Sequence, residues 1–320
     1  MSISRQFSAL GFALAIGSAA SFALSGIFAS ALLTAGWSPG AATTTRISLS
    51  ALILLPPTLI MLRGKWDLVR SAWAQILLFG LLAVAGCQLA FFMAIQFIPP
   101  SLALLIEFMG PVILMLWIWG RTRTAPSKIT MLGAVIAVLG VAAISGVATG
   151  ASLHPLGIIF ALIAAVGLAA YFATGASTEH GIAPLPFVGL GLLVASIVLI
   201  VVSAIGILPF TVTDSPTVVA GTEVAPALVV SGMVLMSTVF AYLLGVSASR
   251  RLGATVASFT GYAEPIFAII WTILLLAITP TGLQWVGAAL IITGVVAVKV
   301  GDVVSAQKLQ PARKKPERVL

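Results

Sequence analysis

The sequence has very little charge. Only 8% of its 320 residues are Asp, Glu, Lys or Arg, whereas 60% are hydrophobic. With a mean hydropathy of +1.19, the chain has too few polar residues to cover a water-exposed surface. Its long apolar runs suit helices, which need about 20 residues to cross a bilayer. They exclude a transmembrane β-barrel, whose strands alternate over about 10 residues. The sequence therefore predicts an all-α membrane protein surrounded by the lipid bilayer.

Cysteine and histidine are also scarce, with one Cys and two His. The single Cys87 cannot form an internal disulfide, and the isolated His154 and His180 do not suggest a metal cluster. The chain lacks a phosphate-binding loop of the NTPase type and any Ser/His/Asp or Cys/His arrangement suited to catalysis. We therefore expect no enzyme activity, no cofactor and no metal site.

The positive charge has a one-sided distribution. The formal net charge of +8 would suit nucleic acid, but every Lys and Arg except Arg46 falls on one side if both chain ends are cytoplasmic. The opposite side carries Asp214 and Glu223. This pattern follows the positive-inside rule. It predicts a multi-pass protein of the inner (plasma) membrane with cytoplasmic N and C termini, and no nucleic-acid partner.

Ten apolar windows are long enough to be membrane-spanning helices. They cover residues 9–33, 41–62, 72–96, 100–119, 129–147, 154–174, 184–206, 227–248, 253–277 and 281–300. Residues 302–320 are polar and basic, and they predict a disordered cytoplasmic tail.

Two parts of the chain repeat the same pattern 154 residues apart. This fixed offset pairs Pro111 with Pro265 and Trp117 with Trp271 without a gap. Because proline and tryptophan are uncommon in the chain, the matches indicate a duplication.

Each copy holds five windows, so the two copies enter the membrane from opposite sides. The loop charges agree, because residues 96–101 carry none while their counterparts include Arg250 and Arg251. The sequence thus predicts two inverted five-helix repeats, residues 9–147 and 154–300.

The fifth and tenth windows are rich in small residues, including Gly133, Gly140, Gly287 and Gly294. Such residues let membrane helices approach closely. This face suits packing within one chain or a homodimer interface, and the sequence leaves both uses open.

Three ionisable residues lie well inside the windows: Arg46, Glu107 and Glu264. Each costs about 2.5–3.5 kcal/mol at a helix centre, so each needs a partner or a wet cavity. At about 1.5 Å per residue, the depths of Arg46 and Glu107 differ by about 3 Å. We therefore expect these two side chains to be able to pair, either as a static ion pair or within a substrate site.

Glu264 lies near the middle of its window, and no basic residue of its own repeat shares that depth. Burial then favours its neutral form. This makes Glu264 a candidate proton-coupling residue. A neutral glutamic acid bonded to a helix carbonyl is the alternative.

Pro111 and Pro265 predict helix kinks, because a proline frees the carbonyl four residues before it. Such carbonyls could receive a substrate ammonium or hydroxyl, although a simple kink is the alternative. Gln88 and Tyr242, which correspond at the 154-residue offset, are further candidate substrate-binding residues together with Tyr262.

These motifs resemble the drug/metabolite transporter superfamily and its EamA domains. The resemblance rests on the ten windows, the two prolines and the segment Gly-Ala-Ala-Leu-Ile-Ile-Thr-Gly-Val at 287–295. Glu-Phe-Met-Gly-Pro at 107–111 and Ala-Glu-Pro at 263–265 resemble the threonine/homoserine exporter branch. Many EamA domains carry Gly-Glu where this chain has Gly120-Arg121, so a role for that acid does not carry over.

The resemblance implies a secondary transporter that exports small metabolites, such as threonine or homoserine, by proton-coupled alternating access. Small-molecule substrate and protons are then its expected partners. An uptake or exchange carrier for a nucleotide-like, sugar-phosphate or drug-like solute is the first alternative. A membrane scaffold without transport is the second.

Overall fold

The structure is a computed structural model, and it describes residues 9–98, 100–145, 154–276, 279 and 281–309. The elements are, in chain order, α1 (Ala9–Thr34), α2 (Pro39–Met61), α3 (Trp66–Leu78), the π-helical segment η2 (Phe79–Gly86), α4 (Cys87–Ala94), α5 (Pro100–Glu107), α6 (Gly110–Thr122), α7 (Lys128–Ser145), α8 (Pro155–Ala176), α9 (Pro184–Ala204), β1 (Thr217–Val219), β2 (Thr222–Val224), α10 (Pro226–Val234), the π-helical segment η4 (Leu235–Phe240), α11 (Ala241–Leu252), α12 (Ala254–Thr260), α13 (Ala263–Leu276) and α14 (Gly282–Leu309).

The helices follow the predicted apolar windows. In the described part of the chain, nine helical stretches are long and apolar enough to cross a membrane, and the apolar helix Lys128–Ile144 is shorter. The third stretch begins at Trp66, six residues before the predicted window. The tail expected from residue 302 is helical as far as Leu309, because α14 continues to that residue. The rest of the predicted tail lies outside the described residues.

Two of the stretches are broken near the middle. A turn at residues 108–109 separates α5 from α6, and a turn at residues 261–262 separates α12 from α13. Pro111 and Pro265 follow these turns by two or three residues, and neither can donate the N–H that a continuous helix requires. At the 154-residue offset the two breaks coincide to within one residue.

Two other stretches contain a π-helical segment. At the 154-residue offset, η2 corresponds to residues 233–240, which include the whole of η4. A π-helical turn inserts an extra residue into a helix and changes the direction of the side chains beyond it. Both segments lead directly into helices that line the cavity described below, α4 and α11.

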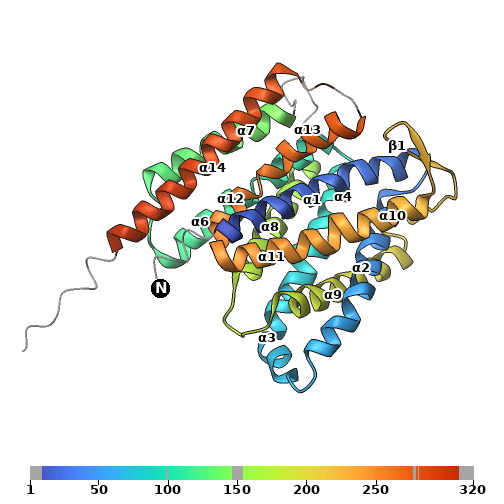
Figure 1. The fold of residues 1–320 in the computed structure, drawn as a ribbon, viewed down its shortest axis with the longest axis horizontal. Coiled ribbons are helices and arrows are strands. Elements are labelled where there is room, and N and C mark those ends of the chain that lie inside the picture. Colours follow the sequence, from blue (N-terminus) through green and yellow to red (C-terminus); the bar gives the residue numbers. More distant parts are fainter. Residues whose placement is uncertain (1–8, 99, 146–153, 277–278, 280, 310–320) are drawn as a thin grey trace, which may run out of the picture.

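Helices α7 and α14 lie along each other at one edge of the molecule (Figure 1). Their contact is made by glycines: a Cβ added to Gly133 would lie 2.7 Å from Gly294 O, and one added to Gly140 would lie 2.7 Å from Gly287 O. The backbones therefore approach more closely than side chains would allow, as small residues permit in membrane helices. This face packs within the chain.

A short β-hairpin lies in the loop before α10. Ala220 and Gly221 both have positive φ, at 54° and 75°, as the two central residues of a type I′ turn require. The loop is tied to the start of α2, because Trp37 Nε1 donates to Thr213 O at 2.8 Å and Thr211 N donates to Ser38 Oγ at 2.9 Å. The hairpin lies at the end of the molecule opposite the last turns of α14 (Figure 1).

The main core contains an aromatic cluster of six rings, Phe22, Phe79, Tyr171, Phe172, Phe187 and Tyr242. Ring centroids are 4.7 Å apart for Phe79 and Phe187, and 5.7 Å apart for Tyr171 and Tyr242. These separations are typical of favourable aromatic pairs. The cluster brings η2 and α1, α8, α9 and α11 together beside the cavity.

Candidate functional site

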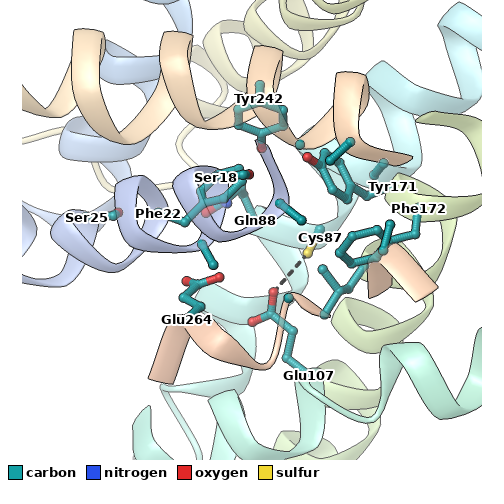
Figure 2. Close-up of a pocket in the computed structure, with 18 of the residues that line it drawn as sticks. Ser18, Phe22, Ser25, Cys87, Gln88, Glu107, Tyr171, Phe172, Tyr242 and Glu264 are labelled. Carbon is teal, nitrogen blue, oxygen red and sulfur yellow. Dashed lines mark hydrogen bonds between the residues drawn. The ribbon is translucent and has the colours of Figure 1, made fainter. Parts of the chain in front are cut away.

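A cavity of about 210 Å³ lies among the helices (Figure 2). It is lined from α1, α2, α4, α5, α8, α11, α12 and α13 and from η2, so both halves of the chain contribute to its wall. Its polar lining residues are Ser18, Ser25, Arg46, Cys87, Gln88, Glu107, Tyr171, Tyr242 and Glu264. The three ionisable residues found inside the predicted windows thus share one cavity.

Arg46 comes from α2 and is 8% exposed. Its Nη1 donates to Ser25 Oγ of α1 at 2.7 Å. Its Nε has no acceptor, and no carboxylate of the described residues lies within ion-pair distance of the guanidinium. A buried donor without an acceptor costs about 1–3 kcal/mol, and more when it is charged. The cavity wall therefore contains a buried cationic donor group that is only partly satisfied by the described residues.

Glu107 is the last residue of α5. Its Oε1 accepts a hydrogen bond from Cys87 Sγ of α4 at 3.3 Å. The expected pairing of Arg46 with Glu107 is not formed in this structure. Both residues line the same cavity, so the pairing stays a prediction for another state of the molecule.

Glu264 lies in the first turn of α13, directly after the helix break. None of the described side chains donates a hydrogen bond to its carboxyl group. The sequence placed Glu264 apart from the other two ionisable residues, whereas the structure brings it into their cavity. The reason is that the breaks of the two helices contact each other, through Phe108 and Tyr262.

The two breaks meet through Phe108 and Tyr262. The tyrosine hydroxyl donates to Phe108 O at 2.6 Å, and the ring centroids are 5.8 Å apart. These two residues correspond to each other at the 154-residue offset. Tyr262 is fully buried and does not line the cavity. Its hydroxyl joins the two breaks in this structure, and its expected contact with substrate stays a prediction.

Gln88 and Tyr242 line the cavity as expected, from α4 and α11. Tyr242 packs edge-on against Phe22 of α1, with ring centroids 5.1 Å apart. In Figure 2, Tyr242 and Tyr171 enter the pocket from the side opposite the two carboxyl groups. The cavity thus has an acidic wall and an aromatic wall.

The prolines shape the breaks and do not line the cavity. The carbonyl of Gly261, which Pro265 was expected to free, accepts a hydrogen bond from Glu264 N at 2.9 Å. A tighter turn has replaced the missing helical bond. That carbonyl already accepts one hydrogen bond, and Gly261 lines the cavity, so its contact with a substrate group stays a prediction.

Ser25, Cys87 and Tyr171 are cavity residues that the sequence did not single out as site residues. Serine and cysteine are unremarkable in a membrane helix, and Tyr171 resembles an interfacial residue. The spacing on α1 does give an indication of the cavity wall. Ala15, Ser18, Ala19, Phe22 and Ser25 recur at helical spacing and form the face of α1 that lines the cavity. Among the described residues, no group of three or more His, Cys, Asp or Glu side chains could hold a metal ion.

Comparisons with known proteins agree with this architecture. The model of the EamA-like transporter family matches residues 9–146 and again residues 155–300. An uncharacterized inner membrane transporter of Salmonella typhimurium, YicL, is 24% identical over 237 residues, which cover 70% of this chain and 72% of that protein.

A protein of known crystal structure has the same fold. It is 16% identical to this chain and superposes with a TM-score of 0.74, over 91% of this chain and 96% of the other. The family model covers most of the sequence in two consecutive matches. The chain therefore belongs to the EamA-like transporter family and is a multi-pass membrane transporter.

Proposed function

We propose that this transporter is a secondary carrier that exports small amino acids, of the threonine and homoserine class, in exchange for protons. The observation that carries the proposal is the state of Arg46, a buried cation that has no anionic partner among the described residues and that lines one cavity together with two carboxyl groups. An amino acid carries the complementary charges, a carboxylate and an ammonium, within one small molecule.

In this arrangement the substrate carboxylate binds Arg46 and Ser25. A guanidinium can hold a carboxylate through two parallel hydrogen bonds, and Arg46 Nε offers the donor that has no acceptor. The ammonium binds Glu107 on the acidic wall. One guanidinium in the wall suits a monoanion better than a phosphate dianion.

Glu264 is the proposed proton carrier. Two carboxylates in a low-dielectric cavity repel each other, so one proton between them lowers the electrostatic cost. Glu264 has no hydrogen-bond donor among the described side chains and is free to exchange that proton. The substrate ammonium and the proton then compete for the carboxyl groups of the acidic wall. This competition is a basis for the exchange of amino acid for protons.

The contacts between the repeats support alternating access by inverted halves. Gly133 contacts Gly294 and Gly140 contacts Gly287, and the 154-residue offset converts each of these contacts into the other. Phe108 and Tyr262 are counterparts that contact each other. Such reciprocity is expected of ten spans arranged as two five-helix repeats around an axis in the membrane plane, with a site between them.

Counterflow in proteoliposomes tests the function. Vesicles that contain the purified protein and unlabelled threonine are expected to accumulate labelled threonine, and a pH gradient is expected to increase the accumulation.

Glu264→Gln should retain counterflow but lose the response to pH, because it cannot release a proton. Glu179→Gln, at an exposed position, is the matched control. Absence of counterflow with any amino acid would reject the substrate class, and an intact pH response in Glu264→Gln would reject the proton carrier.

A further inference from the structure

Cys87 occupies a defined place in the cavity wall. It is the first residue after η2, and it is 5% exposed. Its Sγ lies 3.3 Å from Glu107 Oε1 and 3.4 Å from Ala164 O (Figure 2). A thiol has one proton and is a weak donor, but an ionised carboxylate is a strong acceptor. The bond to Glu107 is therefore the more significant of the two.

Packing holds the thiol in this place. Helices α4 and α8 approach at Gly167, where an added Cβ would lie 2.7 Å from Cys87 Cβ and 2.9 Å from Leu82 O. Because α8 has no side chain at this point, it packs directly on Cys87. The backbone of Cys87 is thus held against α8, and its thiol lies between Ala164 O of that helix and Glu107 of α5.

The other acid has no such partner. At the 154-residue offset Cys87 corresponds to Ala241, whose methyl group cannot donate a hydrogen bond. No described side chain donates to Glu264. The thiol therefore makes the two carboxyl groups of the cavity unequal, because one has a fixed direction and the other does not.

The same cavity gives an independent indication of a ligand. Arg46 Nε is buried and has no acceptor among the described residues, although Arg46 lines the cavity with Glu107. A ligand that satisfies Arg46 brings its other end toward the acidic wall. The orientation of the Glu107 carboxyl group then determines how strongly it binds a positive charge at that end of the ligand.

We propose that Cys87 is a positioning residue that fixes the Glu107 carboxylate for the substrate ammonium. The thiol engages Oε1 and leaves Oε2 for the ligand. This inference rests on the proposed function, in which Glu107 binds the ammonium, and it adds a residue that acts through Glu107.

Three variants test the proposal in the counterflow assay. Cys87→Ala removes the donor and is expected to raise the KM for threonine about fivefold to tenfold, with little change in maximal rate. Cys87→Ser keeps a donor and should stay within about twofold of wild type. In a Glu107→Gln background, adding Cys87→Ala should have no further effect, because the two residues act as one unit.

The outcomes separate the two proposals. If Glu107→Gln leaves KM unchanged, the ammonium site of the proposed function is wrong. If Glu107→Gln raises KM but Cys87→Ala does not, or if Cys87→Ala and Cys87→Ser are equally impaired, the positioning role is wrong.

A spectroscopic measurement covers the case in which Cys87→Ala does not fold. Cys87 is the single cysteine of the chain, so the infrared S–H stretching band reports on this thiol alone. Glu107→Gln should shift the band, because the acceptor loses its charge. Glu264→Gln should leave it in place. A band that does not respond to Glu107→Gln would contradict the proposal.

Discussion

At the scale of single residues, Arg46 stands out because its surroundings are incomplete. Its guanidinium is buried among helices and donates one hydrogen bond to Ser25, yet no carboxylate in the described part of the chain is in contact with it. A charge at a helix centre costs about 2.5–3.5 kcal/mol on insertion scales. A residue that only fixed helix packing would be expected to have its ion pair formed. The incomplete surroundings of Arg46 therefore support the proposal that it binds a substrate carboxylate.

Arg46 variants test this explanation. Arg46→Gln is expected to raise the KM for threonine by at least about tenfold, because a charge-assisted hydrogen bond is lost. The variant should also discriminate less between threonine and its carboxamide, since both then meet a neutral side chain. Competition against labelled threonine uptake measures both effects. Arg70→Gln is the control, because Arg70 is exposed and pairs with Asp67 at the surface. Unchanged discrimination in Arg46→Gln would place the carboxylate elsewhere.

Much of the cavity could be predicted from residue types. Arg46, Glu107 and Glu264 are conspicuous because charge is rare in apolar windows, and the structure brings all three together. Their roles stay predictions. Cys87 and Ser25 could not be predicted, since their significance lies in contacts between helices that no sequence spacing reveals. Tyr262 is a candidate in the sequence because it lies inside an apolar window, but the bond from its hydroxyl to Phe108 O depends on a contact between distant segments that the sequence does not reveal.

At the scale of elements, the α7–α14 pair shows how small residues replace side-chain packing. The glycine contacts there are between backbone atoms, which cannot move aside as a flexible side chain could. Lipid competes poorly for a surface where two backbones fit together, and van der Waals contact drives the association.

Gly140→Ala tests this contact. The added methyl group would lie 2.7 Å from Gly287 O and 2.7 Å from Ile291 N. Alanine favours a helix over glycine by about 1 kcal/mol, but overpacking costs about 1–3 kcal/mol. We therefore expect a lower melting temperature in detergent. Gly120→Ala is the matched control, because a Cβ there meets nothing within 4 Å. If Gly140→Ala melts at as high a temperature as Gly120→Ala, the backbones of α7 and α14 are not in close contact at Gly140.

The spans themselves were predictable because the bilayer demands long apolar helices. The prolines also indicated where two helices break. The π-helical segments η2 and η4 were not predictable, because their residues are as apolar as those of ordinary helices around them. The hairpin β1–β2 was missed as well, since its turn residues are Ala220 and Gly221, and alanine seldom adopts positive φ.

At the scale of the whole molecule, the cavity lies between two halves of the same kind. Helices from both halves supply its walls, so a relative movement of the halves changes the cavity without unfolding either one. A change in tilt could open it toward one side of the membrane and then the other. This motion requires the predicted opposite insertion of the two halves.

Accessibility to a membrane-impermeant maleimide tests that insertion. Asp214→Cys and Arg123→Cys are introduced singly into the Cys87→Ser protein, because both positions are exposed. In intact cells Asp214→Cys should be labelled and Arg123→Cys should not. After permeabilisation both should be labelled, since the charge distribution places Arg123 in the cytoplasm. The opposite pattern would mean that the chain crosses the membrane in the reverse of the predicted orientation. Equal labelling of the two positions in intact cells would refute the opposite insertion of the halves.

The contact between Phe108 and Tyr262 has a consequence for the origin of the chain. In a symmetric dimer of identical five-helix subunits, a contact between counterpart positions would join two identical residues. Two phenylalanines could not form the bond that the Tyr262 hydroxyl donates to Phe108 O, whereas two tyrosines could each donate to the main-chain carbonyl of the other. The present pair, with one hydroxyl, requires two halves of different sequence, which the fused chain provides. A protein rebuilt from two copies of the first half would therefore lose this bond, and one rebuilt from two copies of the second half could form it twice.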